Sequence, residues 1–176
     1  MKVNKIILSL VALISAGSAL ANTSGTIQFS GKVVAGTCSI VAGDVTKSVL
    51  LPGVPNSALS SSGDEAGAVP FALTFENCAV GDVAYAHFSP VTNLANIDGS
   101  HIKNTGTATN VALALYEQDG ATAIDLSQAL AGESVSGSAA APGNDVSLNY
   151  VVKYHATGAA GAGSVQGQLM YDIVYK

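Results

Sequence analysis

Two cysteines are the first residues of this chain whose chemistry has to be assigned. Cys38 and Cys78 lie 40 positions apart, far from the C-x-x-C spacing of a redox pair. The first residues of the chain indicate that it is exported. In an exported chain, an even number of cysteines predicts a structural disulfide. Closing a loop of this length stabilises a fold by roughly 4 kcal/mol in the chain-entropy treatment. We therefore expect a Cys38–Cys78 disulfide.

The other reactive side chains do not form a catalytic or metal-binding pattern. His87, His101 and His155 are scattered, without paired spacing or neighbouring cysteine ligands. No serine occupies a G-x-S-x-G elbow, and Gly161-Ala162-Gly163 lacks the strand–turn–helix context of a dinucleotide site. No feature supports a glycosidase pair among the acids, which fall in predicted turns or loops: Asp64, Glu65, Asp119 and Asp125. We expect no catalytic residue, no metal, no cofactor and no small-molecule substrate.

The first 21 residues have the pattern of a cleaved export signal. A basic start with Lys2 and Lys5 precedes a short apolar run over 6–14 and the small-residue site Ser18-Ala19-Leu20-Ala21. The apolar run is too short to span a membrane, and no second long apolar stretch follows. We expect residues 1–21 to be a signal peptide and the mature protein to be exported.

The mature chain is acidic and long enough for one domain. Without the two leader lysines, Lys+Arg falls from 7 to 5 against 12 Asp+Glu, so the net charge is −7, with no arginine. Nucleic acid and anionic membrane surfaces need clustered basic residues, so both are excluded as partners. The remaining 155 of 176 residues suit a single domain with a full core.

The apolar pattern of the mature chain favours β-structure. Short alternating runs recur between Gly, Asn, Asp and Ser, and no window of 12 or more residues has a 3.6-residue period. This pattern predicts an all-β sandwich. We expect strands at 26–35, 48–51, 69–75, 83–88, 111–115, 145–155 and 165–175, with a short return strand near 123–126. We expect loops at 54–66 (with one helical turn), 90–108 and 130–144.

The stretch over residues 26–35 raises the functional question. Ile27, Phe29, Gly31 and Val33 fall on every second position, with polar residues between them, as in a strand with one buried face. A glycine inside such a face indicates a bulge or the close approach of another backbone. The strand either belongs to the protein's own sheet or pairs with another copy of the protein.

Several short motifs are spread along the mature chain. They are Cys38 seven positions after Gly31, Phe71-x-Leu73-x-Phe75-x-x-Cys78, Tyr154-His155-Ala156-Thr157-Gly158, Gly163 and the penultimate Tyr175. Each motif is weak alone, but behind an export signal the set is specific. This set resembles chaperone–usher fimbrial subunits, and most closely the type 1 major pilins.

This resemblance implies an incomplete immunoglobulin-like β-sandwich, which a donor strand from a neighbouring subunit completes. It divides the mature chain into a donor-strand extension over 22–36 and a pilin domain over 37–176. The donor residues would be Ile27, Phe29, Gly31, Val33 and Ala35. The C-terminal residues that pair with a chaperone and then with the donor would be Gly163, Leu169, Tyr171, Ile173 and Tyr175. Gly163 could also be only a loop glycine.

The resemblance also implies a function. We expect a non-catalytic subunit of a surface fimbria that supports cell adhesion and polymerises by donor-strand exchange. Its partners would be other pilin subunits, a periplasmic chaperone and an outer-membrane usher, with transit through the periplasm to an extracellular fimbria. The alternatives are a minor adaptor pilin and a self-complete exported β-sandwich that binds a sugar or surface partner. The scattered histidines disfavour an enzyme or metalloprotein.

Overall fold

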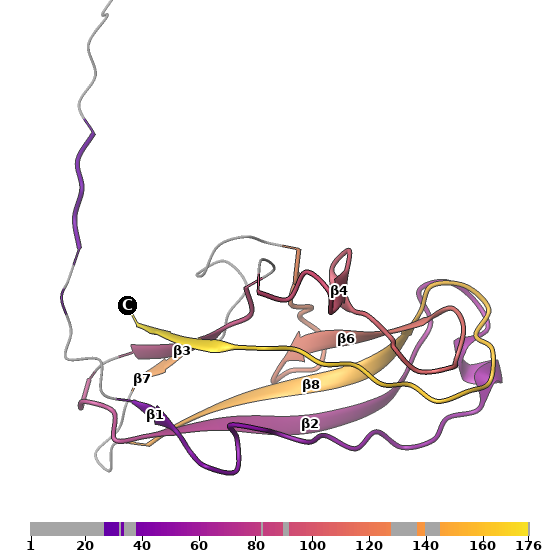
Figure 1. Cartoon of the computed structure of the whole chain (residues 1–176), viewed down its shortest axis with the longest axis horizontal. Helices are drawn as coiled ribbons and strands as arrows, with labels where there is room; N and C mark the ends of the chain where they lie inside the picture. Colours follow the sequence, from indigo (N-terminus) through magenta and orange to yellow (C-terminus); the bar gives the residue numbers. More distant parts are fainter. Residues whose placement is uncertain are drawn as a thin grey trace, which may run out of the picture. The chain divides into compact units, whose positions relative to one another are not determined.

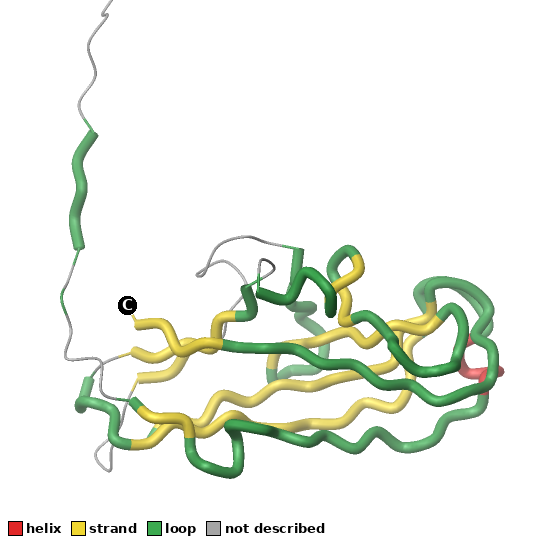
Figure 2. The backbone as a smooth tube through the Cα atoms, in the orientation of Figure 1, coloured by secondary structure: helices red, strands yellow, loops and turns green. Residues whose placement is uncertain are grey.

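The computed structural model describes residues 27–31, 33, 38–81, 83–89, 92–127, 137–139 and 145–175. Two compact units are distinguished, residues 1–31 and 32–176, and each is considered by itself. The regular secondary structure in the described part of the second unit consists of strands, apart from one 3-10 turn at Asn56–Leu59, and loops connect these elements (Figures 1 and 2). The all-β prediction is confirmed. No helix among the described residues is long and apolar enough to cross a membrane.

The larger sheet of the second unit has six antiparallel strands in the order β1-β2-β8-β6-β5-β4. Its strands are β1 (Ser39–Ile40), β2 (Glu65–Glu76), β4 (Ile97–Asp98), β5 (His101–Ile102), β6 (Val111–Glu117) and β8 (Val146–Ala156). The longest pairing joins β2 to β8, from Glu65↔His155 to Phe75↔Val146. A bulge interrupts it after Ala66, where Gly67 has a φ of +66, a conformation that favours glycine.

A smaller sheet has the order β7-β3-β9. It contains β7 (Gly137–Ala139), β3 (Val83–His87) and β9 (Asp172–Tyr175). The β3–β9 ladder runs from Ala84↔Tyr175 to His87↔Asp172. Among the described residues, β9 pairs on one side only and is therefore an edge strand.

Alternate residues of β2, β6 and β8 point into a shared core. Tyr150 at its centre is fully buried, and its ring centroid lies 5.7 Å from those of both Phe71 and Phe88. Burying a large apolar side chain contributes about 1.5–3 kcal/mol, so this core is the main source of stability. Its other fully or nearly fully buried residues include Leu73, Phe75, Leu115, Leu126, Val146 and Leu148.

The predicted disulfide between Cys38 and Cys78 is present. Strand β2 ends at Glu76, and Asn77 follows with a φ of 58°, a left-handed conformation that asparagine tolerates. This turn changes the alternation, so the buried Cys78 faces the core. The bond links the start of β1 to the end of β2.

The strand predictions near 69–75, 83–88, 111–115 and 145–155 are confirmed as β2, β3, β6 and β8. The helical turn predicted within 54–66 is also present. Four predictions were wrong. Residues 48–51 form no strand, and the return strand near 123–126 is a single bridge from Ala123 to Tyr116. Strands β4 and β5 fall in the expected loop over 90–108, and β7 falls in the expected loop over 130–144. Two further stretches differ in a way that bears on function. Of 165–175 only β9 is a strand, and the described residues of 26–35 form none.

Candidate functional site: an unpaired strand edge

The C-terminal segment, residues 164–175, is held to the rest of the sandwich along one edge. The N–H of Ala108 donates to the carbonyl of Ser164 at 2.9 Å. The N–H of Thr105 donates to the carbonyl of Gln166 at 2.8 Å, and the Gln166 N–H donates to Oδ1 of Asn104 at 3.0 Å. Both backbone groups of Gln166 are thus satisfied, one of them by a side-chain amide.

A second side-chain amide holds Met170. Asn93 is fully buried, and its Oδ1 accepts the Met170 N–H at 2.7 Å while its Nδ2 donates to the Met170 carbonyl at 2.9 Å. The same Nδ2 also donates to the carbonyl of Ser89 at 2.9 Å. Asn93 could not be predicted from the sequence, because an asparagine inside a predicted polar loop gives no signal of burial.

These contacts leave the opposite edge of the segment free. In extended chain, the backbone groups of successive residues point to opposite edges. The backbone groups of residues 164, 166 and 170 bond toward the sandwich, so the odd-numbered residues direct their N–H and C=O groups away from it. Within the described part of the chain, the odd-numbered residues before β9 make no backbone hydrogen bond: Val165, Gly167, Leu169 and Tyr171. The segment is an edge with unpaired donors and acceptors.

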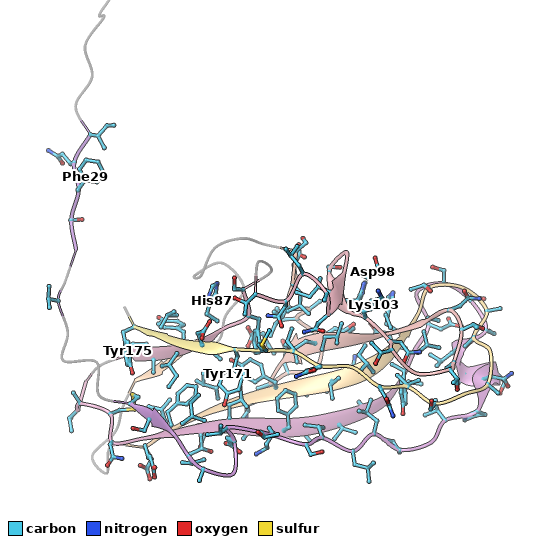
Figure 3. All side chains as sticks on the ribbon, viewed as in Figure 1. Phe29, His87, Asp98, Lys103, Tyr171 and Tyr175 are labelled. Atoms are coloured by element: carbon cyan, nitrogen blue, oxygen red, sulfur yellow. A yellow bond between two sulfur atoms is a disulfide. The ribbon has the colours of Figure 1, made fainter. Side chains whose placement is uncertain are left out.

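The unpaired edge carries a row of apolar side chains. The odd-numbered residues pack against the core but are only partly buried: Val165, Leu169, Tyr171, Ile173 and Tyr175. The first segment of the domain, residues 38–52, contributes a second partly buried set, namely Ile40, Val49 and Leu51. Figure 3 shows Tyr171 and Tyr175 along the C-terminal segment.

Two tyrosine hydroxyls connect the C-terminal segment to the first segment. The hydroxyl of Tyr171 donates to the carbonyl of Asp44 at 3.0 Å, and that of Tyr175 reaches the carbonyl of Cys38 at 3.5 Å. Burial, together with the nearby Asp44 carboxylate, raises the pKa of Tyr171, so its hydroxyl keeps its proton and remains a donor.

Asp44 anchors the first segment to β2. Its buried carboxylate accepts the N–H of Thr74 at 2.7 Å and the ammonium of Lys47 at 2.6 Å. Burial raises the pKa of Asp44, but the Lys47 ammonium and the Thr74 N–H outweigh it and hold the pKa below its ordinary value of 3.8. The carboxylate therefore stays charged at neutral pH.

Gly163 and Gly167 allow the C-terminal segment to lie close to its neighbours. A Cβ at Gly163 would fall under 3.0 Å from the backbone of Thr107 and Ala108. One at Gly167 would meet the side chains of Ile102 and Leu113. Close packing explains glycine at both positions.

The extension, by contrast, buries none of its described apolar side chains. Ile27 is 76% exposed, Phe29 89% and Val33 100% (Phe29 is labelled in Figure 3). A Cβ at Gly31 would meet nothing within 4 Å, so nothing in the described part of the chain requires glycine there. Ala35 lies outside the described residues.

A family model described as "Fimbrial protein" matches residues 27–176. This chain belongs to the fimbrial protein family. The fimbrial subunit is 38% identical to the "F17 fimbrial protein" of Escherichia coli, over 97% of each chain. It is 34% identical to the "Major fimbrial subunit SMF-1" of Stenotrophomonas maltophilia, over 93% of this chain and 99% of that one. The resemblance drawn from the motifs is confirmed.

Two solved structures share the fold of this fimbrial subunit. One is the P pilus rod subunit PapA, with a TM-score of 0.59 and 12% identity over 80% of this chain and 99% of that one. The other comes from a chaperone–usher pilus, with a TM-score of 0.58 and 16% identity over 91% of this chain and all of that one. The incomplete immunoglobulin-like sandwich is the fold of these pilus subunits. The family match and the fimbrial relatives give the chain a structural role as a fimbrial subunit.

One polar cluster lies elsewhere on the fimbrial subunit. Glu65 accepts hydrogen bonds from the Tyr116 hydroxyl and, at 3.0 Å, from the Lys153 ammonium. His155 lies 3.7 Å from Glu65 and stacks on His101, with ring centroids 4.1 Å apart. The described residues contain no group of three ligands that could hold a metal ion.

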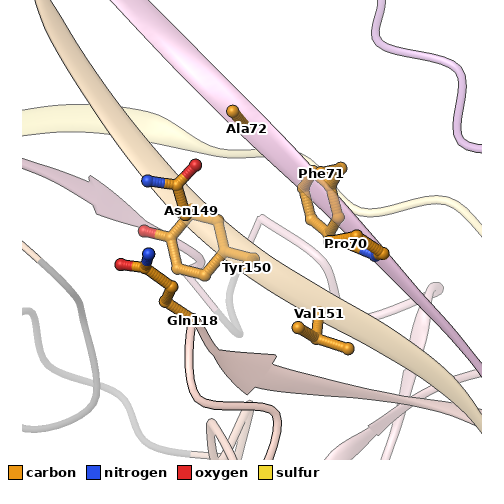
Figure 4. A pocket seen from close by; sticks show the side chains of 7 residues that line it. All are labelled: Pro70, Phe71, Ala72, Gln118, Asn149, Tyr150 and Val151. Carbon is orange, nitrogen blue, oxygen red and sulfur yellow. The ribbon is translucent and has the colours of Figure 1, made fainter.

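A pocket of about 430 Å³ is also free of catalytic groups. Two amides, from Gln118 and Asn149, stand beside apolar residues (Figure 4). Burial raises the pKa of Tyr150, so its phenol keeps its proton. The remaining lining residues are Pro70, Phe71, Ala72 and Val151. None of these groups provides a nucleophile or a general base near pH 7.

Proposed function

We propose that the subunit polymerises by donor-strand exchange, in which residues 22–36 of one copy pair with the unpaired edge of residues 165–175 in the next. The observation that carries this proposal is the row of unpaired backbone groups from Val165 to Tyr171, which lies beside partly buried apolar side chains. An added strand would bond to these groups and cover the apolar row. This is recognition by β-strand addition.

The exposed extension has the properties of such a strand. Ile27, Phe29 and Val33 would become buried, with Ala35 as a last, smaller residue of the same row. Burying the three large side chains contributes roughly 5–8 kcal/mol, and each new backbone hydrogen bond about 0.5–1.5 kcal/mol. Gly31 would lie where the neighbour leaves no room for a side chain, which explains a glycine that its own described surroundings do not require.

Assembly through an open apolar edge requires temporary protection. An unpaired edge invites aggregation, so we propose that a periplasmic chaperone covers the 165–175 edge first and that an outer-membrane usher then receives the subunit. The Cys38–Cys78 disulfide suits folding in the oxidising periplasm after removal of residues 1–21. The pilin domain, residues 37–176, would then reside in an extracellular fimbria, without catalytic activity.

Deletion of residues 22–35 tests this function. The shortened chain should form no polymer, yet should bind a synthetic peptide of residues 22–36 and unfold at a higher temperature with it. The full mature chain, as the control, should polymerise. A shortened chain that polymerises normally and ignores the peptide would instead support a self-complete sandwich that binds its partners as a monomer.

A further inference from the structure

We infer that Asn93 and Tyr171 are positioning residues. They hold the acceptor edge, which is the unpaired edge of residues 165–175, in place before the donor strand binds. This inference rests on the proposed donor-strand exchange. We call the strand position that the donor would fill, between the C-terminal segment and residues 38–52, the gap. The inference concerns what sets the width of this gap before a donor strand binds.

Asn93 takes the place of the next rung of the β3–β9 ladder. That ladder ends at His87↔Asp172, and in the same register it would continue with Phe88↔Tyr171 and then Ser89↔Met170. Instead, the Asn93 amide bonds to the carbonyl of Ser89 and to both backbone groups of Met170. A side chain is thus inserted between the two backbones. It holds the segment away from the end of β3 and satisfies both backbone groups of Met170.

The position of Asn93 is itself fixed by its own turn. Its N–H donates to the Ser89 carbonyl at 3.1 Å, and its carbonyl accepts the N–H groups of Asn96 and Ile97 at 2.7 and 3.0 Å. With the three side-chain bonds, both the backbone and the amide are held in place. Asn93 is therefore a rigid support for the C-terminal segment.

Tyr171 spans the gap from the other side. An extended tyrosine with an O–H···O bond of about 2.8 Å reaches across roughly two strand spacings of about 4.8 Å each. That is the distance between two strands when one strand is missing between them. The hydroxyl meets the carbonyl of Asp44, which its carboxylate ties to the Thr74 N–H in β2. Tyr171 therefore acts as a spacer between the two sides of the gap.

The aromatic core fixes the direction of this spacer. The ring centroid of Tyr171 lies 6.3 Å from that of Phe75 and 6.4 Å from that of Phe88. The hydroxyl bridge therefore lies on the core side of the gap, and the unpaired backbone edge stays accessible. Less chain has to be ordered when a strand binds, which is the benefit of pre-organisation.

The test compares two tyrosine hydroxyls that both donate to carbonyls of residues 38–52. Tyr171→Phe removes the proposed spacer. Tyr154→Phe is the matched control, because the Tyr154 hydroxyl donates to the carbonyl of Pro52 at 3.1 Å but starts from β8 and not from the acceptor edge. Each variant is made in the full mature chain and kept at nanomolar concentration. The association rate of a fluorescent peptide of residues 22–36 and the thermal midpoint of the peptide-free chain are measured.

We expect Tyr171→Phe to slow association roughly fivefold, as for the loss of one hydrogen bond, and Tyr154→Phe to leave the rate within about twofold. Asn93→Ala should slow association further and remove the protection of the Met170 amide from hydrogen exchange. Equal slowing in both tyrosine variants, an unchanged rate in Tyr171→Phe, or faster association in Tyr171→Phe would overturn the inference. A wild-type chain that takes up no peptide would overturn the proposed function as well.

Discussion

Replacing Phe29 with alanine should weaken the fibre without affecting the free subunit. Phe29 is 89% exposed in the subunit, so its truncation should change the free energy of unfolding by no more than about 0.5 kcal/mol. In the fibre the same side chain would be buried in a neighbour, where Phe→Ala costs about 3–5 kcal/mol. Each junction should therefore dissociate roughly 150- to 5,000-fold more readily.

Two denaturation curves measure this difference. One follows the unfolding of the unpolymerised full chain, and the other follows the dissociation of purified fibres in guanidinium chloride. Gln28→Ala is the matched control, since Gln28 is exposed and belongs to the alternate row of the same stretch. Equal effects of Phe29→Ala and Gln28→Ala on the fibre would refute the assignment of Phe29 to the buried row. So would a loss of stability in the free Phe29→Ala chain.

Three further predictions concern the extension and the charged groups. Gly31→Leu should leave the unfolding of the free subunit unchanged, because a Cβ there meets nothing within 4 Å, but should block incorporation into fibres; normal fibre yield would contradict this. The pKa of Asp44 is lowered, so its contribution to the free energy of unfolding should be present above pH 3.8 and be lost as the pH falls through the folded-state pKa. In denaturant titrations at several pH values, Asp44→Asn should make the free energy of unfolding less dependent on pH in this range. Burial, with the neighbouring His155, lowers the pKa of His101, so the free energy of unfolding should fall as the pH drops below 6.5. His101→Phe should remove this part of the pH dependence. A pH profile of His101→Phe identical to that of the wild type would show that the stacked pair does not contribute to it.

The strands that could be predicted from the sequence are those that pair along most of their length. At the start of β8 buried and exposed side chains alternate, and in β6 the larger Val111, Leu113 and Leu115 alternate with alanines, so a period of two is visible without a structure. The same holds for the disulfide, because the cysteine count and the export signal suffice to predict it.

The acceptor edge was only partly predictable, because its backbone contacts come from distant side chains. The apolar alternation of 165–175 marked the right residues but suggested one continuous strand. The structure limits the strand to β9, since Asn93 and Asn104 take the place of a neighbouring strand before it. The Tyr171–Asp44 contact joins residues 127 positions apart, and no local pattern encodes such a pair.

Cysteine cross-linking in assembled fibres tests donor-strand exchange most directly. One cysteine replaces Ser30 in the exposed row of the extension, and the second replaces Gln166, Gln168 or Met170 in the outward row of the C-terminal segment. Donor pairing predicts that at least one combination forms disulfides between copies, seen as a ladder of covalent multimers under denaturing conditions. Fibres in which none of the three combinations links one copy to the next would contradict the account.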